Sequence, residues 1–183
     1  MKTTDLTIYV RPNYNPGRNI IVQCLWYFVN HVVFGCPFFI CYGLKRWLLR
    51  LFGAKVGERV IIKPNVNIKF PWRLEIGDNV WIGEKAWIDN IDVVKIGRNA
   101  VLSQHVLVIT GSHNYKKTNF ELITHPVVIE DGVWVCANAT VLAGSYLKSH
   151  SMVTAGSVAP KTAEPYSIYT GNPAVKVKNR IIG

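Results

Sequence analysis

Acidic side chains are scarce in this chain of 183 residues, which holds 11 Asp and Glu against 21 Lys and Arg and has a formal net charge of +10. Such an excess favours an anionic partner, which can be a nucleic acid, an anionic membrane surface or a phosphate-bearing small ligand. A solvated basic surface is the alternative. Because the basic residues are scattered and no helix-turn-helix or aromatic RNA-binding motif is present, nucleic acid is disfavoured.

Cysteines are also few, and their spacing is irregular. Cys24, Cys36, Cys41 and Cys136 form no CxxC pair of the kind that binds zinc. Three of them lie in an apolar N-terminal stretch, where free cysteine behaves as a small hydrophobe. The pattern predicts a reducing, cytoplasmic compartment. The first residues show no charged-then-apolar order, so we expect no signal peptide.

Long uninterrupted apolar runs are lacking as well. The stretch Ile20–Leu44 is strongly apolar, but Gln23, Asn30 and Pro37 are among the residues that interrupt it, and a membrane-spanning helix takes about 20 mostly apolar residues. Packed helices or an interfacial segment are therefore favoured. The sequence LKRWLLRLF at 44–52 is typical of a membrane-surface helix. A helix docked on its own domain or on a neighbouring subunit is the alternative.

What the chain does have is a six-residue period that starts at Val56. An aliphatic side chain opens each hexapeptide, and fourteen of the fifteen opening residues are Val, Ile or Leu. The opening positions are 56, 62, 68, 76, 82, 88, 96, 102, 108, 129, 135, 141, 147, 153 and 159. A six-residue period does not hold one face of a helix, so an amphipathic helix is excluded. The repeat predicts a solenoid in which each hexapeptide supplies a short strand and a corner.

Three hexapeptides make one triangular coil, so we expect a mainly β fold: a prism of about five coils over residues 56–164 with the aliphatic side chains inside. Asn and Gly suit the corners because they tolerate positive φ. The spacing widens to eight residues after 68 and after 88, which predicts bulges at corresponding corners of successive coils. The spacing of twenty-one after 108 predicts an extruded loop at about residues 113–128, and long loops on a regular scaffold are commonly functional.

The repeat also divides the chain into three parts. We expect a helical, apolar N-terminal extension over residues 1–55, the β-helix over 56–164, and a C-terminal tail over 165–183 that packs on the prism.

The order of motifs resembles the hexapeptide-repeat acyltransferases over most of the chain. TGSH at 110–113 precedes the extruded loop, and the loop is followed by PVVIEDGVWVCANATVLAG at 126–144, TAGSVAPK at 154–161 and GNPAVKVK at 171–178. This order is similar to that of galactoside, maltose and exopolysaccharide O-acetyltransferases. GLKRWLLRLFGAKVG, at 43–57, resembles the colanic-acid-type polysaccharide acetyltransferases.

The resemblance implies a fold and an activity that the spacing alone does not. It implies a left-handed parallel β-helix, although crossover connections are usually right-handed. It also implies a homotrimer with active sites between subunits, acetyl-CoA as the co-substrate, no required metal, and transfer of an acetyl group to a sugar hydroxyl in exopolysaccharide biosynthesis. The acceptor is then a sugar or a glycolipid, and the apolar N-terminus is compatible with peripheral contact at the inner face of the membrane.

His113 is the candidate catalytic residue, because in this family a His that follows TG or TGS is the general base. A neutral imidazole can take the proton from an acceptor hydroxyl as the oxygen attacks the thioester. With both substrates bound together, proximity supplies much of the rate and no acyl-enzyme is required. A surface histidine at a corner is the alternative. His105 and His150 fall at corners and are expected to be solvated, and nothing obvious activates Cys136 as a nucleophile.

The family also supplies candidate binding residues. The positions that line the CoA groove in the family match Trp134, Ala137, Ala155 and Lys161. The cations that bind CoA phosphates match Lys176, Lys178 and Arg180. Corner packing and a solvated basic tail are the alternatives for these residues. On the acceptor side the match is thin, and the nearest candidates are Asp89, Asn90, Asp92 and His125, with turn formation at corners as the alternative.

Two other functions compete with acetyl transfer. A hexapeptide-repeat metalloenzyme of the carbonic-anhydrase type needs three converging histidines. His105, His113 and His125 are available, but they do not reproduce the close pair of ligand histidines of that family. A non-catalytic scaffold is the second competitor.

Overall fold

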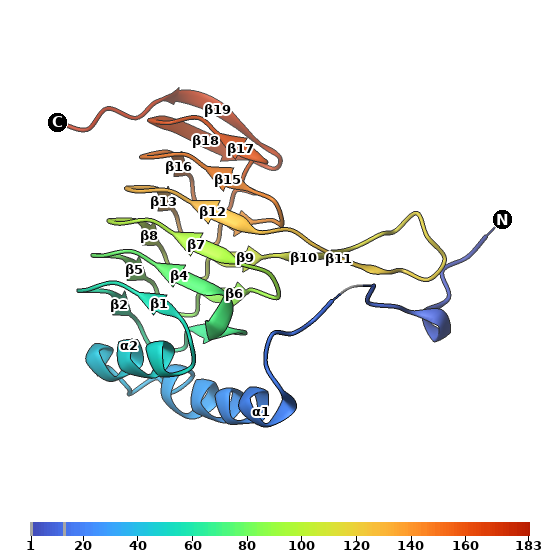
Figure 1. Cartoon of the computed structure of the whole chain (residues 1–183). Coiled ribbons are helices and arrows are strands. Elements are labelled where there is room, and N and C mark those ends of the chain that lie inside the picture. The colour runs from blue at the N-terminus through green and yellow to red at the C-terminus, as the bar shows by residue number, and fades with distance from the viewer. Residues whose placement is uncertain (1, 13) are drawn as a thin grey trace.

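The computed structural model describes residues 2–12 and 14–183, and the repeat region forms a stack of parallel β-coils with three faces (Figure 1). One face is a parallel sheet in the order β1-β4-β7-β12-β15-β17. Its strands are β1 (Lys55–Val56), β4 (Leu74–Ile76), β7 (Val94–Ile96), β12 (Val127–Ile129), β15 (Tyr146–Leu147) and β17 (Thr162–Ala163).

The other two faces are built in the same way. The second sheet runs β2-β5-β8-β13-β16-β18-β19, and the third runs β3-β6-β9-β14. The second contains β2 (Ile61–Ile62), β5 (Trp81–Ile82), β8 (Val101–Leu102), β13 (Trp134–Val135), β16 (Met152–Val153), β18 (Ser167–Gly171) and β19 (Ala174–Asn179). The third contains β3 (Asn67–Ile68), β6 (Trp87–Asp89), β9 (Leu107–Ile109) and β14 (Thr140–Val141).

The aliphatic residues that open the hexapeptides form the core of the stack. Every one of the fifteen is buried, and Val56, at the N-terminal end, is the most accessible with 9% exposure. Residues from successive coils stack directly, as Ile62 does on Ile82 and Ile82 on Leu102. The predicted parallel solenoid is therefore confirmed, while the hand of its winding stays a prediction from the resemblance.

The solenoid has about six turns, where the hexapeptide period predicts about five coils. The difference lies in the tail, because β18 continues the stack by pairing in parallel with β16. The chain then reverses, and β19 pairs antiparallel with β18. The tail thus adds a layer to the prism and covers its C-terminal end (Figure 1).

Corners are made by a residue in the left-handed conformation at the fourth position of the hexapeptide. Asn65, Asn79, Asn99 and Asn138 have φ between 56° and 59° there. Four other non-glycine residues share this conformation at the same position, namely Arg59, Lys85, His105 and His150. Asn and Gly were expected at corners, and the structure shows that long cationic and histidine side chains are also accepted where they point into solvent or stack.

The two eight-residue spacings produce bulges that stack on each other, as predicted. In the first coil the bulge contains the 3₁₀ turn η3 (Pro71–Arg73). The side chain of Asn90, in the second bulge, accepts a hydrogen bond from Phe70 N (2.9 Å) and donates one to Phe70 O (2.6 Å). In the third coil, Thr110 Oγ1 accepts from Asp92 N at 2.8 Å. The extruded segment therefore leaves the prism at the same corner as the bulges.

The extruded segment is a paired hairpin. Its strands β10 (Gly111–His113) and β11 (Leu122–Thr124) are antiparallel, and Val127 rejoins the prism in β12. An N-terminal arm, residues 2–12 and 14–16 with the 3₁₀ turn η1 (Leu6–Ile8), runs beside it (Figure 1). Asp5 N donates to Thr118 O at 2.8 Å, and Leu122 N donates to Val10 O at 3.2 Å.

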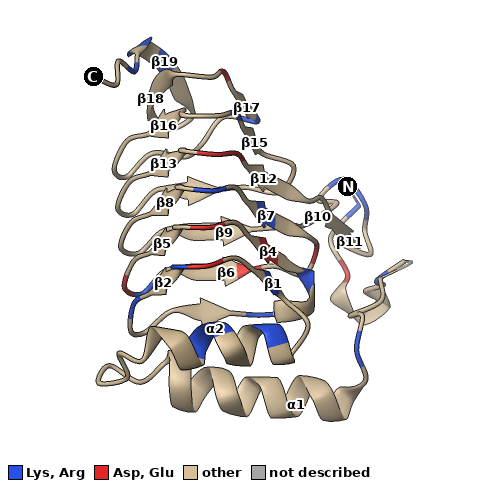
Figure 2. Cartoon of the chain, turned by 60° about the vertical axis from the view of Figure 1, so that its left-hand side comes forward, with Lys and Arg blue, Asp and Glu red and all other residues tan. Residues whose placement is uncertain are grey.

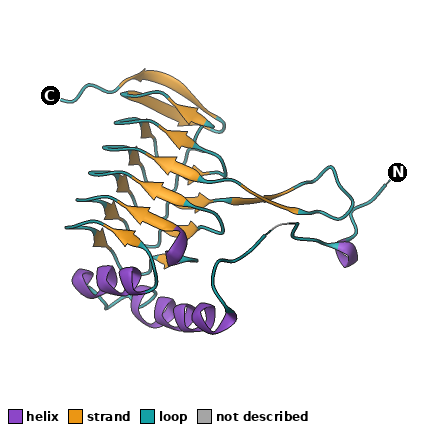
Figure 3. Cartoon of the chain, in the orientation of Figure 1, coloured by secondary structure: helices purple, strands orange, loops and turns teal. Residues whose placement is uncertain are grey.

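Helices cover the N-terminal end of the prism (Figures 1 and 3). They are α1 (Ile20–Val29), the π-helical η2 (Asn30–Phe34) and α2 (Tyr42–Leu51), and we call residues 19–52 the N-terminal cap. Trp26, Phe34 and Leu49 are buried against the first coil. Among the described residues, no helix has both the length and the apolar character needed to cross a bilayer.

The cap satisfies carbonyl groups of the first coil, which has no preceding coil to bond. Lys45 Nζ donates to Ile62 O (3.2 Å) and Lys63 O (3.1 Å), and Arg50 Nε donates to Val56 O (2.9 Å). Further donors are Arg46 Nη1 to Val60 O and Trp26 Nε1 to Ile68 O. Buried carbonyls need such partners, so the basic side of α2 faces the protein. This is the docked helix that was the alternative to a free membrane-surface helix.

Candidate active site

A cavity of about 470 Å³ lies where the hairpin leaves the prism. Three parts of the chain enclose it: the N-terminal arm, helix α1 and the stacked bulges. Its lining side chains that carry polar groups include Tyr9, Arg11, Tyr14, Gln23, Tyr27, Lys69, Asp89 and His113. The volume lies in the range of small-molecule sites, and apolar walls with a few convergent polar groups are typical of them.

His113 is held in one tautomer by the turn of its own hairpin. Its Nδ1 lies 3.0 Å from the carbonyl oxygen of Phe120. A carbonyl can only accept a hydrogen bond, so Nδ1 carries the proton and Nε2 of the neutral ring is left with a free lone pair. The imidazole is thereby prepared to accept a proton at Nε2.

Aromatic rings fix the plane of this imidazole. The ring of Phe120 stacks on it with a centroid distance of 4.4 Å and an angle of 7°. The ring of Tyr9, from the N-terminal arm, lies at 5.8 Å and 53°. Stacking and the Nδ1 hydrogen bond restrict both rotation and translation of the ring, which is the positioning that proton transfer requires.

Charged groups occupy the prism side of the cavity. Asp89, in β6, forms an ion pair with Lys69 at 2.8 Å, and both side chains are half-buried. Tyr14 lies on the opposite wall, where burial raises the pKa of its phenol. The phenol therefore stays protonated and able to donate a hydrogen bond. The cavity thus presents a carboxylate, a cation and a hydroxyl beside the imidazole of His113.

Comparison with known proteins decides the family. Over 177 residues, which are 97% of this chain and 97% of its relative, the sequence is 33% identical to WcaF of Escherichia coli K12, an acetyltransferase assigned to colanic acid biosynthesis. The chain belongs to the WcaF-type hexapeptide-repeat acetyltransferases. The galactoside O-acetyltransferase of the same organism is 27% identical over 132 residues, covering 70% of this chain and 65% of the relative. No family model matches the sequence.

Solved structures of acetyltransferases share the fold. A hexapeptide-repeat acetyltransferase of Vibrio cholerae superposes with a TM-score of 0.79 at 21% identity, covering 87% of this chain and 90% of the other. A maltose O-acetyltransferase of Clostridium difficile superposes with a TM-score of 0.75 at 18% identity, covering 90% of each chain. These identities are low, so the likeness concerns the fold.

Of the four acceptor-binding residues expected from the family resemblance, the structure places one in the His113 cavity and three elsewhere. Asp89 lines the His113 cavity. Asn90 is fully buried, and its amide serves the backbone of Phe70. Asp92 accepts a hydrogen bond from Val93 N at 2.7 Å, as a turn-forming residue does. His125 is exposed and lines two other depressions, one of them shared with Lys161.

The expected CoA groove residues lie away from that cavity within one chain. Trp134 points outward from β13, with 39% exposure, and its Nε1 donates to Ser103 Oγ at 3.0 Å. Ala137 and Ala155 occupy the next corner in successive coils, where Gly156 N donates to Ala137 O at 2.9 Å. None of the expected CoA residues is among the described residues that line the His113 cavity.

The expected phosphate cations are only partly available. Lys178 is exposed, and Lys176 is paired with Glu164 at 2.7 Å. Arg180 Nη1 donates to two backbone carbonyls, Gly132 O at 2.9 Å and His150 O at 3.2 Å. Arg180 therefore ties the tail to the prism through the hydrogen bonds that a phosphate would otherwise take.

Other nucleophilic and titratable candidates have structural surroundings. His105 is exposed at its corner. His150 was expected to be solvated, but it is half-buried and stacks on Tyr166 at 4.7 Å and 2°. Cys136 is buried, and burial raises the pKa of its thiol, which makes it a poor nucleophile. In residues 2–12 and 14–183 no group of three or more His, Cys, Asp or Glu is placed to bind a metal.

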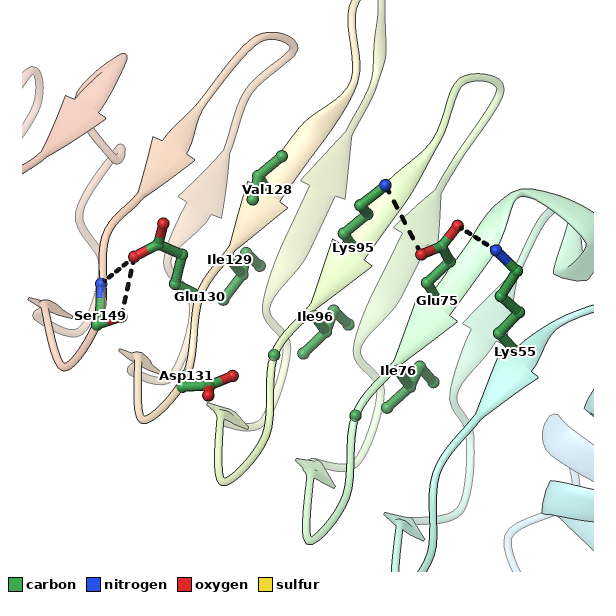
Figure 4. Close-up of a pocket in the computed structure, with 12 residues that line it drawn as sticks. Lys55, Glu75, Ile76, Lys95, Ile96, Val128, Ile129, Glu130, Asp131 and Ser149 are labelled. Carbon is green, nitrogen blue, oxygen red and sulfur yellow. Dashed lines mark hydrogen bonds and ion pairs between the residues drawn. The ribbon is translucent and has the colours of Figure 1, made fainter.

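A second depression, of about 560 Å³, lies on the face formed by β1, β4, β7 and β12 (Figure 4). Glu75 stands between Lys55 (3.1 Å) and Lys95 (3.7 Å), so one carboxylate pairs with the cations of both neighbouring coils. At its far side Glu130 accepts from Ser149 N at 2.7 Å, and its hydrogen bond from Tyr146 lowers the pKa of the carboxyl. The carboxylates that line this depression, Glu75, Glu130 and Asp131, are all paired.

Sequence reasoning missed the residues that the N-terminal arm brings to the cavity. Tyr9, Arg11 and Tyr14 lie about a hundred residues from His113 in the chain, outside any repeat. Arg11 stacks over the Tyr9 ring at 5.7 Å, and the guanidinium of Arg73 lies over the Tyr14 ring at 5.5 Å. The alternating aromatic and basic residues of YVRPNY could have signalled a binding segment, but nothing in them indicates where it docks.

Proposed function

We propose that this protein transfers the acetyl group of acetyl-CoA to a hydroxyl of a sugar in exopolysaccharide biosynthesis, with His113 as the general base. Family membership with WcaF supports the reaction. The observation that carries the assignment to His113 is its Nδ1 contact with Phe120 O, which leaves Nε2 as the proton acceptor of a ring that lines a cavity of substrate size.

His113 acts on the acceptor hydroxyl in a direct transfer. Nε2 takes the hydroxyl proton while the acceptor oxygen attacks the thioester carbonyl. The new C–O ester bond forms, the C–S bond breaks, and the imidazolium returns its proton to the departing CoA thiolate. Phe120 O stabilises the imidazolium through Nδ1. No group of the protein becomes acylated.

The cavity supports a sugar as the acceptor. Tyr9, Tyr14 and Phe70 supply aromatic walls, and Asp89 and Lys69 supply an acceptor and a donor for ring hydroxyls. Asp89 keeps the acceptor-binding role that the family resemblance gives it, whereas Asn90 acts through the stacked bulges and positions Phe70.

We also propose the homotrimer and the intersubunit CoA groove of the family. The outward column on β2, β5, β8, β13 and β16 is apolar, with Trp81 at 54% and Trp134 at 39% exposure. By contrast, the column on β1, β4 and β7 is Lys55, Glu75 and Lys95. Apolar columns favour contact with another copy of the chain. A groove beside Trp134, Ala137, Ala155 and Lys161, completed by a neighbour, would take CoA, with Lys178 near its phosphates.

The enzyme works on the cytoplasmic side, where acetyl-CoA is present, and its acceptor is a sugar or a glycolipid. Peripheral contact of the N-terminal segment with the inner face of the membrane belongs to this proposal.

The test is a matched pair of histidine substitutions. His113→Asn removes the base and should lower kcat/KM for acetyl transfer to a sugar at least about a hundredfold. His105→Asn is the control, because Asn tolerates the positive φ of that exposed corner. Release of free CoA and the mass of the acetylated product, over a panel of sugars, report the activity.

Retained turnover in folded His113→Asn would reject the base assignment. A wild-type protein that binds no acetyl-CoA and acetylates no sugar of the panel would instead favour the non-catalytic scaffold.

A further inference from the structure

The outward side of the N-terminal cap is apolar. Exposed large hydrophobic side chains follow α1, the segment after η2, and α2, with Phe28 at 68%, Phe38 at 89% and Trp47 at 56% exposure. The full set is Ile20, Ile21, Leu25, Tyr27, Phe28, Val32, Phe38, Ile40, Leu44, Trp47 and Leu51. We call this set the cap surface. So many exposed apolar side chains on two helices mark an interaction site, since water-facing helices normally show polar side chains outward.

Helix α2 shows the arrangement most clearly, because its amphipathic character is inverted. Lys45 is fully buried and Arg46 is half-buried, and both donate to carbonyls of the first coil. Leu44, Trp47 and Leu51 recur at i, i+3 and i+7 on the opposite side and are exposed. Figure 2 shows Lys and Arg positions in blue on α2, which lies between the prism and α1, and none on α1. The polar side of α2 is already used by the protein, so the apolar side is the one left for a partner.

The charge around the cap surface indicates which partner. Residues 19–44 contain no charged side chain other than His31, and residues 6–57 contain six Lys and Arg but no Asp or Glu. Arg18 and Arg50 are exposed at its rim, and Glu58, the first acid after the cap, is already paired with Arg50 at 2.8 Å. A second copy meeting this surface would offer no carboxylate from residues 6–57 to pair Arg18. An apolar surface with a basic rim instead complements an anionic lipid bilayer.

We propose that the cap surface docks in the interfacial layer of an anionic lipid bilayer, with the prism axis directed away from it. Trp47 and Tyr27 suit this depth, because amphipathic rings partition to the headgroup region. Short helices held flat by the prism insert their apolar side chains and do not span. Binding therefore combines apolar burial with attraction between the basic rim and anionic headgroups.

Docking also bears on the acetyl-transfer site. Gln23 and Tyr27 of α1 line the His113 cavity, while Phe28 of the same helix belongs to the cap surface. A docked cap therefore holds the acceptor side of the cavity beside the lipid headgroups. This consequence rests on the proposed function, but the docking itself does not.

Vesicle flotation with the purified full-length protein tests the proposal. Vesicles of phosphatidylcholine containing phosphatidylglycerol should carry wild-type protein, and pure phosphatidylcholine vesicles should carry less, because the rim attraction is lost. The double variant Phe28→Ser/Trp47→Ser should bind at least about tenfold more weakly, since two large apolar side chains leave the lipid. Both residues are exposed in the protein, so thermal unfolding and acetyl transfer to a soluble sugar should be unchanged.

The matched control is Tyr115→Ser/Ile181→Ser, which removes two large exposed apolar side chains outside the cap, at 78% and 92% exposure, and should float like wild type. Equal binding by both double variants, or no binding of wild type to anionic vesicles, would overturn the proposal. Light scattering over a range of protein concentrations gives the other decisive outcome. If self-association disappears in Phe28→Ser/Trp47→Ser but not in the control, a second copy covers the cap surface and the lipid proposal is wrong.

Discussion

The prism and the N-terminal cap use apolar side chains in opposite ways. In the prism the aliphatic side chains point inward and the charged ones outward, as Ile76 and Glu75 do in adjacent positions of β4. In α2 of the cap the buried Lys45 points inward and the exposed Trp47 outward. The prism face of β1, β4 and β7 therefore satisfies the usual rule for a surface in water, and the cap satisfies the hydrogen bonds of an open β-edge instead.

This contrast follows from what each part must cover. Coils inside the prism find neighbours on both sides for their backbone groups, whereas the carbonyls of the first coil face the cap. A helix covering such an edge does best with long donors toward it, because buried unpaired carbonyls cost about 1–3 kcal/mol each. Lysine and arginine reach several carbonyls each, and the apolar residues between them are left on the outer side.

Truncating one apolar side chain in each region tests this difference most strongly, because the expected losses of stability differ most. Ile82→Ala opens a cavity in the core column of the prism and should lower the free energy of unfolding by about 2–5 kcal/mol. Phe28→Ala removes a larger side chain from the cap surface and should change it by no more than about 0.5 kcal/mol. Urea unfolding followed by circular dichroism measures both. Similar losses in the two variants would mean that the cap surface is packed against protein in solution.

Gly→Ala substitutions in the prism and in the cap test the same comparison, with smaller expected changes in the free energy of unfolding. A methyl group added at Gly97, in the prism, would meet Asp131 N at 2.5 Å, in the backbone of the next coil. Gly97→Ala should therefore destabilise the prism by about 1–3 kcal/mol. At Gly43, in α2, the nearest group is the end of the flexible Arg46 side chain at 4.0 Å, and Gly43→Ala should stabilise by about 0.5–1 kcal/mol. Equal melting temperatures for the two variants would show that coil spacing does not require the prism glycine.

The prism was predictable because its information is periodic. The positions of the core aliphatics, the corner residues and the stacked bulges all follow from counting from Val56, and they lie where the count puts them. The extra layer formed by β18 was not predicted, since SIYTG carries no hexapeptide pattern. A repeat predicts only the strands that carry the repeated pattern. It does not predict strands of other sequence that continue the stack.

The site was predictable only where a motif names it. TGSH singles out His113, and the register brings Asp89 toward it. Tyr9, Arg11 and Tyr14 reach the cavity through hydrogen bonds between the N-terminal arm and the hairpin, such as Leu122 N to Val10 O. Such contacts between segments distant in sequence leave no local pattern. Asn90 shows the converse, because a turn-forming amide and an acceptor ligand look alike in sequence.

The smallest expected effect concerns the buried cation that joins the two regions. Burial of Lys45 lowers the pKa of its ammonium to about 8, against an ordinary value of 10.5. Between these values the unfolded chain binds a proton that the folded chain does not, so this group makes the protein more stable as pH rises through about 8. Lys45→Met lacks the titration and leaves Ile62 O and Lys63 O without this donor. The melting temperature of wild type minus that of Lys45→Met should therefore widen from neutral pH to about pH 10, because every other titrating group is common to both proteins. A difference that stays constant over that range would mean that the ammonium is held charged by its two carbonyl partners, and that the cap accepts a buried positive charge without cost.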